Sequence, residues 1–459
     1  MQKIIIKNFG PVKKAEIEIT PLLVLIGEQA TGKSTIAKLI YFFKSLSDAL
    51  LNRYLESTDF DIDLPRDVIS VTREKFFDFF GSTLNLDEFI VTYYYCEDGS
   101  LTLTLTENKK LAIQLSEYFQ NKDFSSKLSS FKESFLILKK GIELSEATSK
   151  TKLTNLFEHT QINFLRQFTT TINEIFSNVH NDSSYIIAGR NATIGYSSFF
   201  ESMLAASLQK RLESQASNAY EAKEQTIEES LMLDFLQRVS NMRQFMNKYG
   251  DFEGIIQNAH EDKRKVLTIA HSLVQKIIRG NYTSGADEKI MLDDGNYVYL
   301  TNASSGQKEA IRILQDAFIA INSDNNVSRI IEEPEAHIFP EAQMYLLQLL
   351  AMLLNNKENN QIIITTHSPY VLSVINNLMY AYKVGQKDSE KVNKIVQKES
   401  WLDPEKVNAY MLTTAKGSER IIDDDLDMIK AERIDEVSEK LNEDFNKLLN
   451  IEYGEESKE

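Results

Sequence analysis

The sequence has little cysteine, little proline and no long hydrophobic run. Cys96 is the only cysteine among 459 residues, which excludes a disulfide framework, a cysteine-based zinc site and a zinc hook. No apolar run has the length of a membrane span, and the first residues have the pattern of a strand and not of a signal peptide. We therefore expect a cytoplasmic protein without membrane contact. The scarcity of proline, beside an ordinary 42% of hydrophobic residues, predicts a mostly folded and largely helical chain.

Positive charge is also scarce relative to negative charge. The chain has 51 Lys and Arg against 67 Asp and Glu, a formal net charge of −16. This surplus argues against a general nucleic-acid coat, although it is compatible with a local basic groove. An acidic surface suits a basic protein partner or solubility, and solubility is the simpler explanation. The length predicts two or three structural units.

One glycine-bounded stretch organises the chain. Residues 27–35 fit the pattern G-x-x-x-x-G-K-[ST], with a short apolar run at 22–26 before them and apolar residues at helical spacing after them. Strand, turn and helix in this order aim several backbone N–H groups and the positive end of a helix dipole at one point. The motif predicts a nucleoside triphosphate site made of Gly27, Gln29, Ala30, Thr31, Gly32, Lys33, Ser34 and Thr35. In it, Lys33 can reach the β- and γ-phosphates and the Ser34 hydroxyl is placed to coordinate Mg²⁺.

A second strand pattern ends in two adjacent carboxylates. Glu332 and Glu333 follow the apolar residues 330–331, which is the arrangement of a Walker B site. One acid can orient Mg²⁺ and its waters, and the next can polarise the attacking water. Two acids at the end of a buried strand would be costly without a cation or a catalytic task. We therefore predict a metal role for Glu332 and a catalytic role for Glu333.

A third apolar strand, predicted over residues 361–366, ends at His367. The carboxyl ends of the central strands are where α/β folds bind ligands. His367 is therefore a candidate for contacting the γ-phosphate or ordering the attacking water. A lone histidine is usually structural, but this one follows the other two motifs.

The rest of the chain divides into three predicted parts. Residues 1–107 and 285–459 carry the motifs, and the second of these parts ends in an acidic helix. Between them, residues 108–284 have a mainly helical composition, interrupted by a strand of the motif-bearing part near residues 185–190. The helical stripes of this insertion are too short for a long coiled-coil arm. They are Leu204, Leu208 and Leu212, then Leu236, Val239 and Met246, and then Val266, Ile269, Leu273 and Ile277. Other predicted strands are residues 1–20 as two strands around Asn8, a hairpin over 89–106, a hairpin over 290–300, and residues 380–384.

Arg190 closes the strand pattern at 185–190, directly after a glycine. If that strand ends beside the nucleotide, Arg190 can contact phosphate. The alternative is a surface arginine at a turn. The residues alone leave both interpretations open.

The complete set of motifs resembles an ABC-type ATPase head of the RecF/SMC-like branch, and most closely the overcoming-lysogenisation-defect (OLD) family and its stand-alone bacterial relatives. Residues 6–11 also resemble that branch, in which Asn8 would lie near the adenine. The resemblance implies an α/β fold: a P-loop ATPase head, with a mixed sheet and a helical lobe, that carries a large, mainly helical insertion. It further implies that Ser304, Ser305, Gly306 and Gln307 are the signature motif. Taken alone, these four residues would be ordinary helix capping.

In such heads two protomers enclose two ATP molecules. The resemblance implies that Lys33 and Ser34 bind ATP and Mg²⁺ within one protomer, while Ser304 and Gly306 reach the γ-phosphate in the other. The site is then complete only in a homodimer or a higher homo-oligomer. Three departures affect the expected turnover: Ser305 replaces a common glycine, Glu332 replaces the usual aspartate, and no glutamine marks a Q-loop.

OLD nucleases carry a TOPRIM domain after the ATPase, and the sequence after His367 is too short for it. The resemblance therefore implies a stand-alone ATPase like those of the PARIS and Septu phage-defence systems, which control an effector, here a nuclease, in trans. The alternative is a RecF/SMC-like repair ATPase that binds DNA directly. A transporter ATPase is disfavoured by the large insertion and the Glu332–His337 motif.

Overall fold

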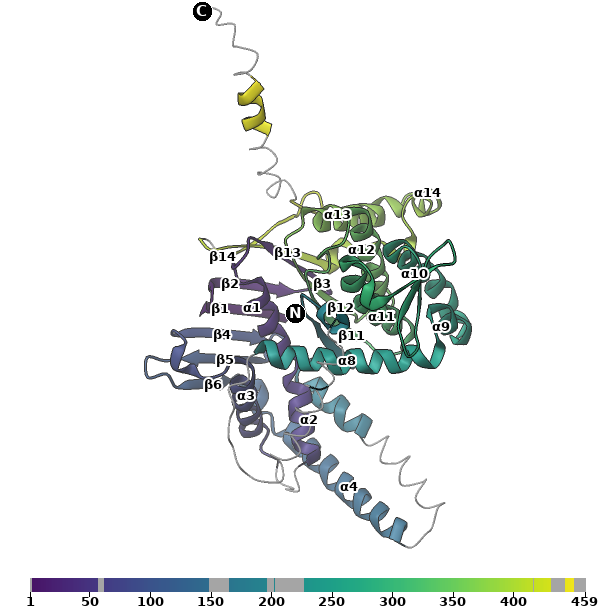
Figure 1. Ribbon diagram of the computed structural model, residues 1–459. Coiled ribbons are helices and arrows are strands. Elements are labelled where there is room, and N and C mark those ends of the chain that lie inside the picture. The colour runs from purple at the N-terminus through teal and green to yellow at the C-terminus, as the bar shows by residue number, and fades with distance from the viewer. Residues whose placement is uncertain are drawn as a thin grey trace, which may run out of the picture.

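The computed structural model describes residues 2–56, 62–147, 165–195, 202, 227–415, 417–430 and 442–449. Its centre is a six-stranded sheet in the order β14-β13-β3-β12-β11-β7 (Figure 1). All neighbouring pairs in this sheet are parallel except β13 and β14. The strands are β3 (Leu22–Gly27), β7 (Asp182–Ile186), β11 (Val327–Glu332), β12 (Gln361–Thr366), β13 (Val407–Thr413) and β14 (Gly417–Arg420).

A second, antiparallel sheet in the order β2-β1-β4-β5-β6 adjoins the first. Its strands are β1 (Gln2–Phe9), β2 (Val12–Ile19), β4 (Phe89–Tyr94), β5 (Ser100–Leu105) and β6 (Leu111–Leu115). Ile4 and Ile6 of β1 and Ala15, Ile17 and Ile19 of β2 lie at every second position and are buried, and Ile4 pairs with Ile17. The two sheets are joined where the Glu18 N–H donates to the Tyr410 hydroxyl (3.1 Å). The predicted hairpins over 1–20 and 89–106 are confirmed.

Helices cover both sheets. The segment after β3 forms α1 (Lys33–Lys44), α2 (Leu46–Glu56) and α3 (Leu64–Phe80). Helix α4 (Lys122–Ala147) projects away from the sheets (Figure 1). The other helices are α6 (Ala192–Gly195), α8 (Ile227–Tyr249), α9 (Phe252–Asn258), α10 (Glu261–Ile278), α11 (Ser305–Asn322), α12 (Pro340–Asn355), α13 (Pro369–Gly385) and α14 (Ser389–Asn393).

Two small sheets complete the described chain. Strands β8 (Asn281–Thr283), β9 (Lys289–Met291) and β10 (Tyr297–Tyr299) form an antiparallel sheet, which confirms the predicted hairpin over 290–300. Strands β15 (Ile422–Asp423) and β16 (Met428–Ile429) form the other. Among the described residues, no helix is long and apolar enough to cross a membrane.

The strand predicted over residues 380–384 is wrong. These residues form the C-terminal end of α13, whose buried side chains recur at helical spacing along the whole element. Tyr380 is more than half exposed because it lies on the outer face of that helix. The alternation of aromatic and small residues is therefore a local coincidence, and packing of the longer helix decides the conformation.

The segment predicted as an insertion contributes elements to both parts of the motif-bearing domain. Strand β6 extends the antiparallel sheet, β7 pairs with β11, and α10 packs against α11 and α12. The stripe on α10 is buried or half-buried, and so are Leu236, Val239 and Met246 on α8. The stripe Leu204, Leu208, Leu212 lies outside the described residues. Of the acidic C-terminal helix, only residues 442–449 are described, and Phe445 and Leu448 are exposed there.

Candidate active site at the carboxyl ends of β3, β12 and β11

Three neighbouring parallel strands bring the candidate catalytic residues to one edge of the central sheet. Thr366 pairs with Ile26, and Glu332 pairs with Thr365, so β3, β12 and β11 end side by side. The P-loop follows β3, His367 follows β12, and Glu333 follows β11. Segments more than 300 residues apart in sequence therefore meet, because the carboxyl ends of parallel strands lie at the same edge.

The P-loop glycines are required by close contacts. A Cβ atom at Gly27 would lie 2.3 Å from the carbonyl oxygen of Leu412, and one at Gly32 would lie 2.3 Å from Cγ2 of Val12. Ala30 and Gly32 both have positive φ angles, of 60° and 95°. The loop is thus fixed from outside by β13 and by the turn between β1 and β2.

Lys33 is buried at the start of α1 and curls back over its own loop. Its Nζ donates to the carbonyl oxygens of Gly27 (2.8 Å) and Glu28 (2.7 Å). Burial lowers the pKa of Lys33, and the carboxylates of Glu333 and Glu335 oppose this by favouring the charged form. Thr31 also donates to the Glu28 carbonyl (2.8 Å), so the loop is held in a closed ring.

Glu332 is almost fully buried and is held by β7 and the segment after it. Its carboxylate accepts a hydrogen bond from the Tyr185 hydroxyl (2.6 Å) and another from the Ala188 N–H (3.1 Å). Burial, and then the negative charge of Glu332, raises the pKa of Tyr185 well above its usual value, so the phenol stays a donor. Two donors therefore compensate the burial of the Glu332 carboxylate.

Glu333 and His367 face one another across the end of the sheet. His367 Nε2 lies 3.5 Å from Glu333 Oε1, and both side chains are partly exposed, at 34% and 41%. The Glu333 N–H donates to the Thr365 carbonyl (2.8 Å), which directs the side chain away from β11. The φ angle of Glu333 is +41°, a strained value for a residue with a side chain. Such strain persists only where neighbouring contacts fix the backbone.

Glu335 was not among the residues singled out in the sequence, although it is the third acid of Glu332-Glu333-Pro334-Glu335. Its Oε1 accepts hydrogen bonds from the Thr366 hydroxyl (2.5 Å) and from the His367 N–H (3.1 Å). Its Oε2 is buried and has no hydrogen-bond partner among the described residues. Glu335 thus anchors the turn that carries His367.

The interpretation of Arg190 as a surface arginine is wrong. The side chain is not at the surface, since its exposed fraction is 0%. Its Nε, Nη1 and Nη2 all donate to backbone carbonyls within the protein, and the phosphate contact stays a prediction. The sequence could not reveal this, because the carbonyls belong to three segments that only the fold brings together.

The candidate signature residues lie in a different hollow from the P-loop. Ser304 caps α11, and Ser304 and Gln307 form a capping box. Gln307 Nε2 also donates to the Ile278 carbonyl (2.7 Å), which ties α11 to the end of α10. A hollow of about 650 Å³ lies in front of this helix end, lined by 304–307, 337–339 and the cations Lys276 and Arg279. No P-loop residue lines it.

Asn8 is the next-to-last residue of β1, with a φ angle of +57°. It lines a polar hollow of about 430 Å³ together with Gly10, Lys13 and residues 85–89. Gly10 adjoins the P-loop helix, because a Cβ atom there would lie 3.9 Å from Cγ2 of Thr35. The hollow is thus next to the end of the predicted triphosphate site.

Comparison with protein families gives one match, to the family described as "AAA ATPase domain", over residues 1–372. The chain belongs to this AAA ATPase domain family. No curated protein matches it.

Solved structures similar to this AAA ATPase domain include two SMC heads and a recombination mediator protein. The SMC head domain from Thermotoga maritima is 11% identical, with a TM-score of 0.33, and the match covers 81% of this chain and 90% of that one. The SMC head bound to the C-terminal winged-helix domain of ScpA is 9% identical (TM-score 0.37; 81% and 91% covered). The recombination mediator RecF is 12% identical (TM-score 0.27; 91% and 97% covered).

The donor set of this AAA ATPase domain fits Mg²⁺. The half-exposed Ser34 hydroxyl and the Glu332 carboxylate are hard oxygen donors, which Mg²⁺ prefers, and the ion usually takes further ligands from phosphates and water. Among the described residues, no group of three or more His, Cys, Asp or Glu side chains is placed to hold a metal ion. A site shared between two protein groups and a triphosphate does not need one. Ser34 and Glu332 would hold the ion.

Proposed function

We propose that the chain is an ABC-type ATPase that binds ATP with Mg²⁺ and hydrolyses the γ-phosphate. The observation that carries this proposal is the meeting of the P-loop, Glu333 and His367 at the ends of three adjacent strands. On binding, Lys33 Nζ exchanges the carbonyls of Gly27 and Glu28 for phosphate oxygens. Ser34 and Glu332 would hold Mg²⁺, which would supply positive charge to the phosphate oxygens.

Glu333 is the proposed general base. Its carboxylate is partly exposed and lies at the sheet edge where the attacking water would stand. His367, 3.5 Å away, orients the water or contacts the γ-phosphate. Hydrolysis consumes one water, transfers its proton to Glu333 and releases ADP and phosphate.

The proposed active unit is a homodimer or a higher homo-oligomer. The α11 N-terminus presents Ser304, Ser305 and Gly306 to a hollow that contains no P-loop residue, so a second copy must supply the nucleotide there. The cations Lys276 and Arg279 at that hollow favour a negatively charged group. ATP would therefore join two protomers.

For the biological role we propose a cytoplasmic sensor and scaffold of bacterial anti-phage defence that controls an effector protein, a nuclease in trans. This part rests on the order of the sequence motifs, which resembles the OLD-family and PARIS- or Septu-type ATPases. Release of the effector would follow a change in the nucleotide state of the dimer.

The test uses purified wild-type protein, Lys33→Ala and Glu333→Gln. We expect Mg²⁺-dependent phosphate release by the wild type only, ATP binding by Glu333→Gln, and no ATP binding by Lys33→Ala. Equal ATP occupancy in both variants would overturn the assignment of Lys33.

The role is tested with tagged Glu333→Gln captured from its host in the presence of ATP, with and without nuclease treatment. A stoichiometric protein that resists nuclease treatment supports the sensor role and identifies the effector. DNA recovered without a protein partner would overturn that role in favour of direct DNA binding.

A further inference from the structure

Arg190 lies in the protein interior and contacts both the Glu332–Glu333 segment and helix α11. Its Nη1 donates to the Glu332 carbonyl (2.8 Å) and to the Ile187 carbonyl (3.0 Å), and Nη2 donates to the Glu333 carbonyl (2.9 Å). Nε donates to the Glu309 carbonyl (3.0 Å). One guanidinium thus contacts the carbonyls of both Walker B acids and the signature helix α11.

The contact to Glu333 fixes a strained peptide. Glu333 has a φ angle of +41°, and its N–H is bound to Thr365 while its C=O is bound to Arg190. Because both backbone groups of Glu333 are held, its side chain is directed toward His367. Without the guanidinium, the carbonyl would lack a buried donor and the backbone could relax toward an ordinary φ.

Arg190 also contacts helix α11, through the side chain of Glu309. Glu309 is buried on this helix, one turn beyond Ser305, and its Oε2 lies 3.3 Å from Arg190 Nε. That oxygen has no hydrogen-bond partner among the described residues, so Arg190 is its compensating charge. Burial lowers the pKa of Arg190, and Glu309 is the first of the carboxylates that oppose this. A shift of α11 must therefore move Arg190 or separate a buried ion pair.

We infer that Arg190 is a positioning residue that couples the signature helix to the general base. The inference rests on the proposed function, because it assigns a consequence to nucleotide contact at the α11 N-terminus. When a nucleotide held by a second copy engages Ser304–Gly306, α11 is fixed, Glu309 and Arg190 are fixed with it, and Glu333 takes its catalytic position. Hydrolysis is then restricted to the assembled dimer, while ATP binding at the P-loop is not.

Two variants test the coupling from its two ends. Arg190→Lys keeps the charge but has too few donors to hold all four carbonyls, and Glu309→Gln keeps the shape of the side chain but removes the charge. We expect either variant to lower kcat at least tenfold while the affinity for a fluorescent ATP analogue changes less than threefold. We also expect the wild-type rate per protomer to rise with protein concentration, and this rise to be lost in both variants.

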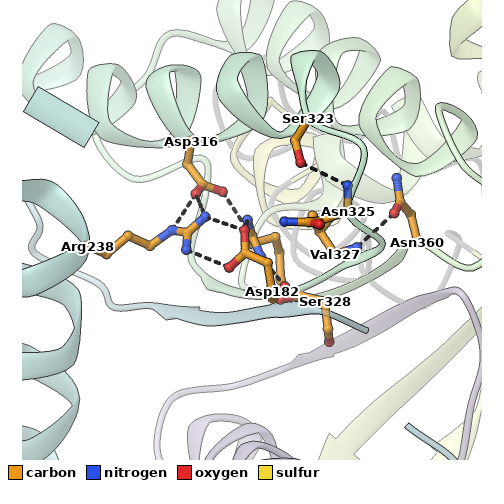
Figure 2. A network of polar contacts seen from close by, with 9 residues as sticks. Asp182, Arg238, Asp316, Ser323, Asn325, Val327, Ser328 and Asn360 are labelled. Atoms are coloured by element: carbon orange, nitrogen blue, oxygen red, sulfur yellow. Dashed lines mark hydrogen bonds and ion pairs between the residues drawn. The ribbon is translucent and has the colours of Figure 1, made fainter. Parts of the chain in front are cut away.

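Arg329→Lys is the matched control. Arg329 is also fully buried on β11, three residues before Glu332. Its partner Asp182 lies at the opposite end of the strand, and its partner Asp316 lies on α11 but about three turns beyond Ser305. Figure 2 shows the two acids Asp182 and Asp316 together with Arg238, which contacts both. The control should lower the melting temperature like the two test variants but retain kcat and its concentration dependence.

Three results distinguish a failure of the coupling from a failure of the proposed function. If Arg190→Lys and Glu309→Gln keep wild-type kcat, the coupling is overturned and the ATPase stands. The same holds if Arg329→Lys lowers kcat as much as the two test variants do. If Arg190→Lys does not fold, Glu309→Gln alone decides by the same criteria. If the wild type shows no Lys33-dependent hydrolysis, the proposed function itself has failed, and the inference falls with it.

Discussion

The side chain of Glu335 and the backbone N–H of His367 are joined by a hydrogen bond of 3.1 Å between the ends of β11 and β12. The same carboxylate oxygen accepts from the Thr366 hydroxyl at 2.5 Å. The position of His367 is therefore set by the turn that carries Glu333. The two catalytic candidates share one support.

Replacing Glu335 should displace His367 from its position beside Glu333. Glu335→Ala removes the acceptor, so we expect kcat for ATP hydrolysis to fall by roughly one to two orders of magnitude through misplacement of His367. Glu335→Gln retains an acceptor oxygen and should lose less. Steady-state kinetics check this, with the exposed Glu358→Ala as control. A wild-type kcat in Glu335→Ala would show that His367 needs no such support.

Gly306 should tolerate no side chain. A Cβ atom there would lie 2.6 Å from the carbonyl oxygen of His337, so Gly306→Ala must displace the start of α11 or the 333–338 turn. We expect about 1–3 kcal/mol of destabilisation and a loss of turnover larger than the loss of ATP binding. Thermal unfolding and nucleotide titration measure the two effects. Gly285→Ala is the control, because its Cβ would meet nothing closer than 3.8 Å; equal effects at both positions would contradict the prediction.

Tyr185 should affect the dependence on Mg²⁺. Tyr185→Phe removes the 2.6 Å hydrogen bond to Glu332 and leaves one carboxylate oxygen of Glu332 without that donor. We expect this loss to lower the free energy of unfolding by about 1–3 kcal/mol. Because outer contacts orient metal ligands, we expect the Mg²⁺ concentration for half-maximal activity to rise by about 10-fold. Tyr95→Phe loses a buried hydrogen bond to the Phe43 carbonyl far from the site and should lower stability only. An unchanged Mg²⁺ requirement in Tyr185→Phe would argue against Glu332 as a ligand.

Stability should depend on pH through Lys44 and His180. Burial lowers the pKa of Lys44 from 10.5 to about 7, and burial followed by the charge of Lys44 lowers the pKa of His180 from 6.5 to about 3. In both cases the unfolded chain binds more protons, for Lys44 between pH 7 and 10.5 and for His180 between pH 3 and 6.5, so stability rises with pH in these windows.

Lys44→Met tests the contribution of Lys44. It removes the cost of burying a charge below pH 7, although Gln2 Oε1 loses a donor at 3.0 Å. We expect the melting temperature of the variant, relative to wild type, to be higher at pH 6 than at pH 9. Differential scanning calorimetry at the two pH values measures this. A difference that does not depend on pH would mean that Lys44 titrates normally in the fold.

Much of the site could be predicted from the sequence because its chemistry is local. Residues 27–35 fix a strand, turn and helix by their own spacing, and the apolar residues before Glu332 and His367 mark strands that end in functional side chains. The α/β P-loop ATPase fold, the hairpins over 1–20, 89–106 and 290–300, the strand before Glu332 and the strand over 361–366 are confirmed for the same reason. The division into 1–107, 108–284 and 285–459 stays a prediction.

Only the tertiary structure decided which residues support those motifs. Arg190, Tyr185 and Glu309 are held by partners more than 100 residues away, and hydrogen bonds to backbone carbonyls leave no pattern in a sequence. Residues 380–384 became helical because burial of the whole of α13 outweighed a local strand preference. The sequence by itself determined the residues that can bind and cleave a triphosphate. Long-range packing determined how they are held, because register, burial and buried charge pairs exist only once distant segments meet.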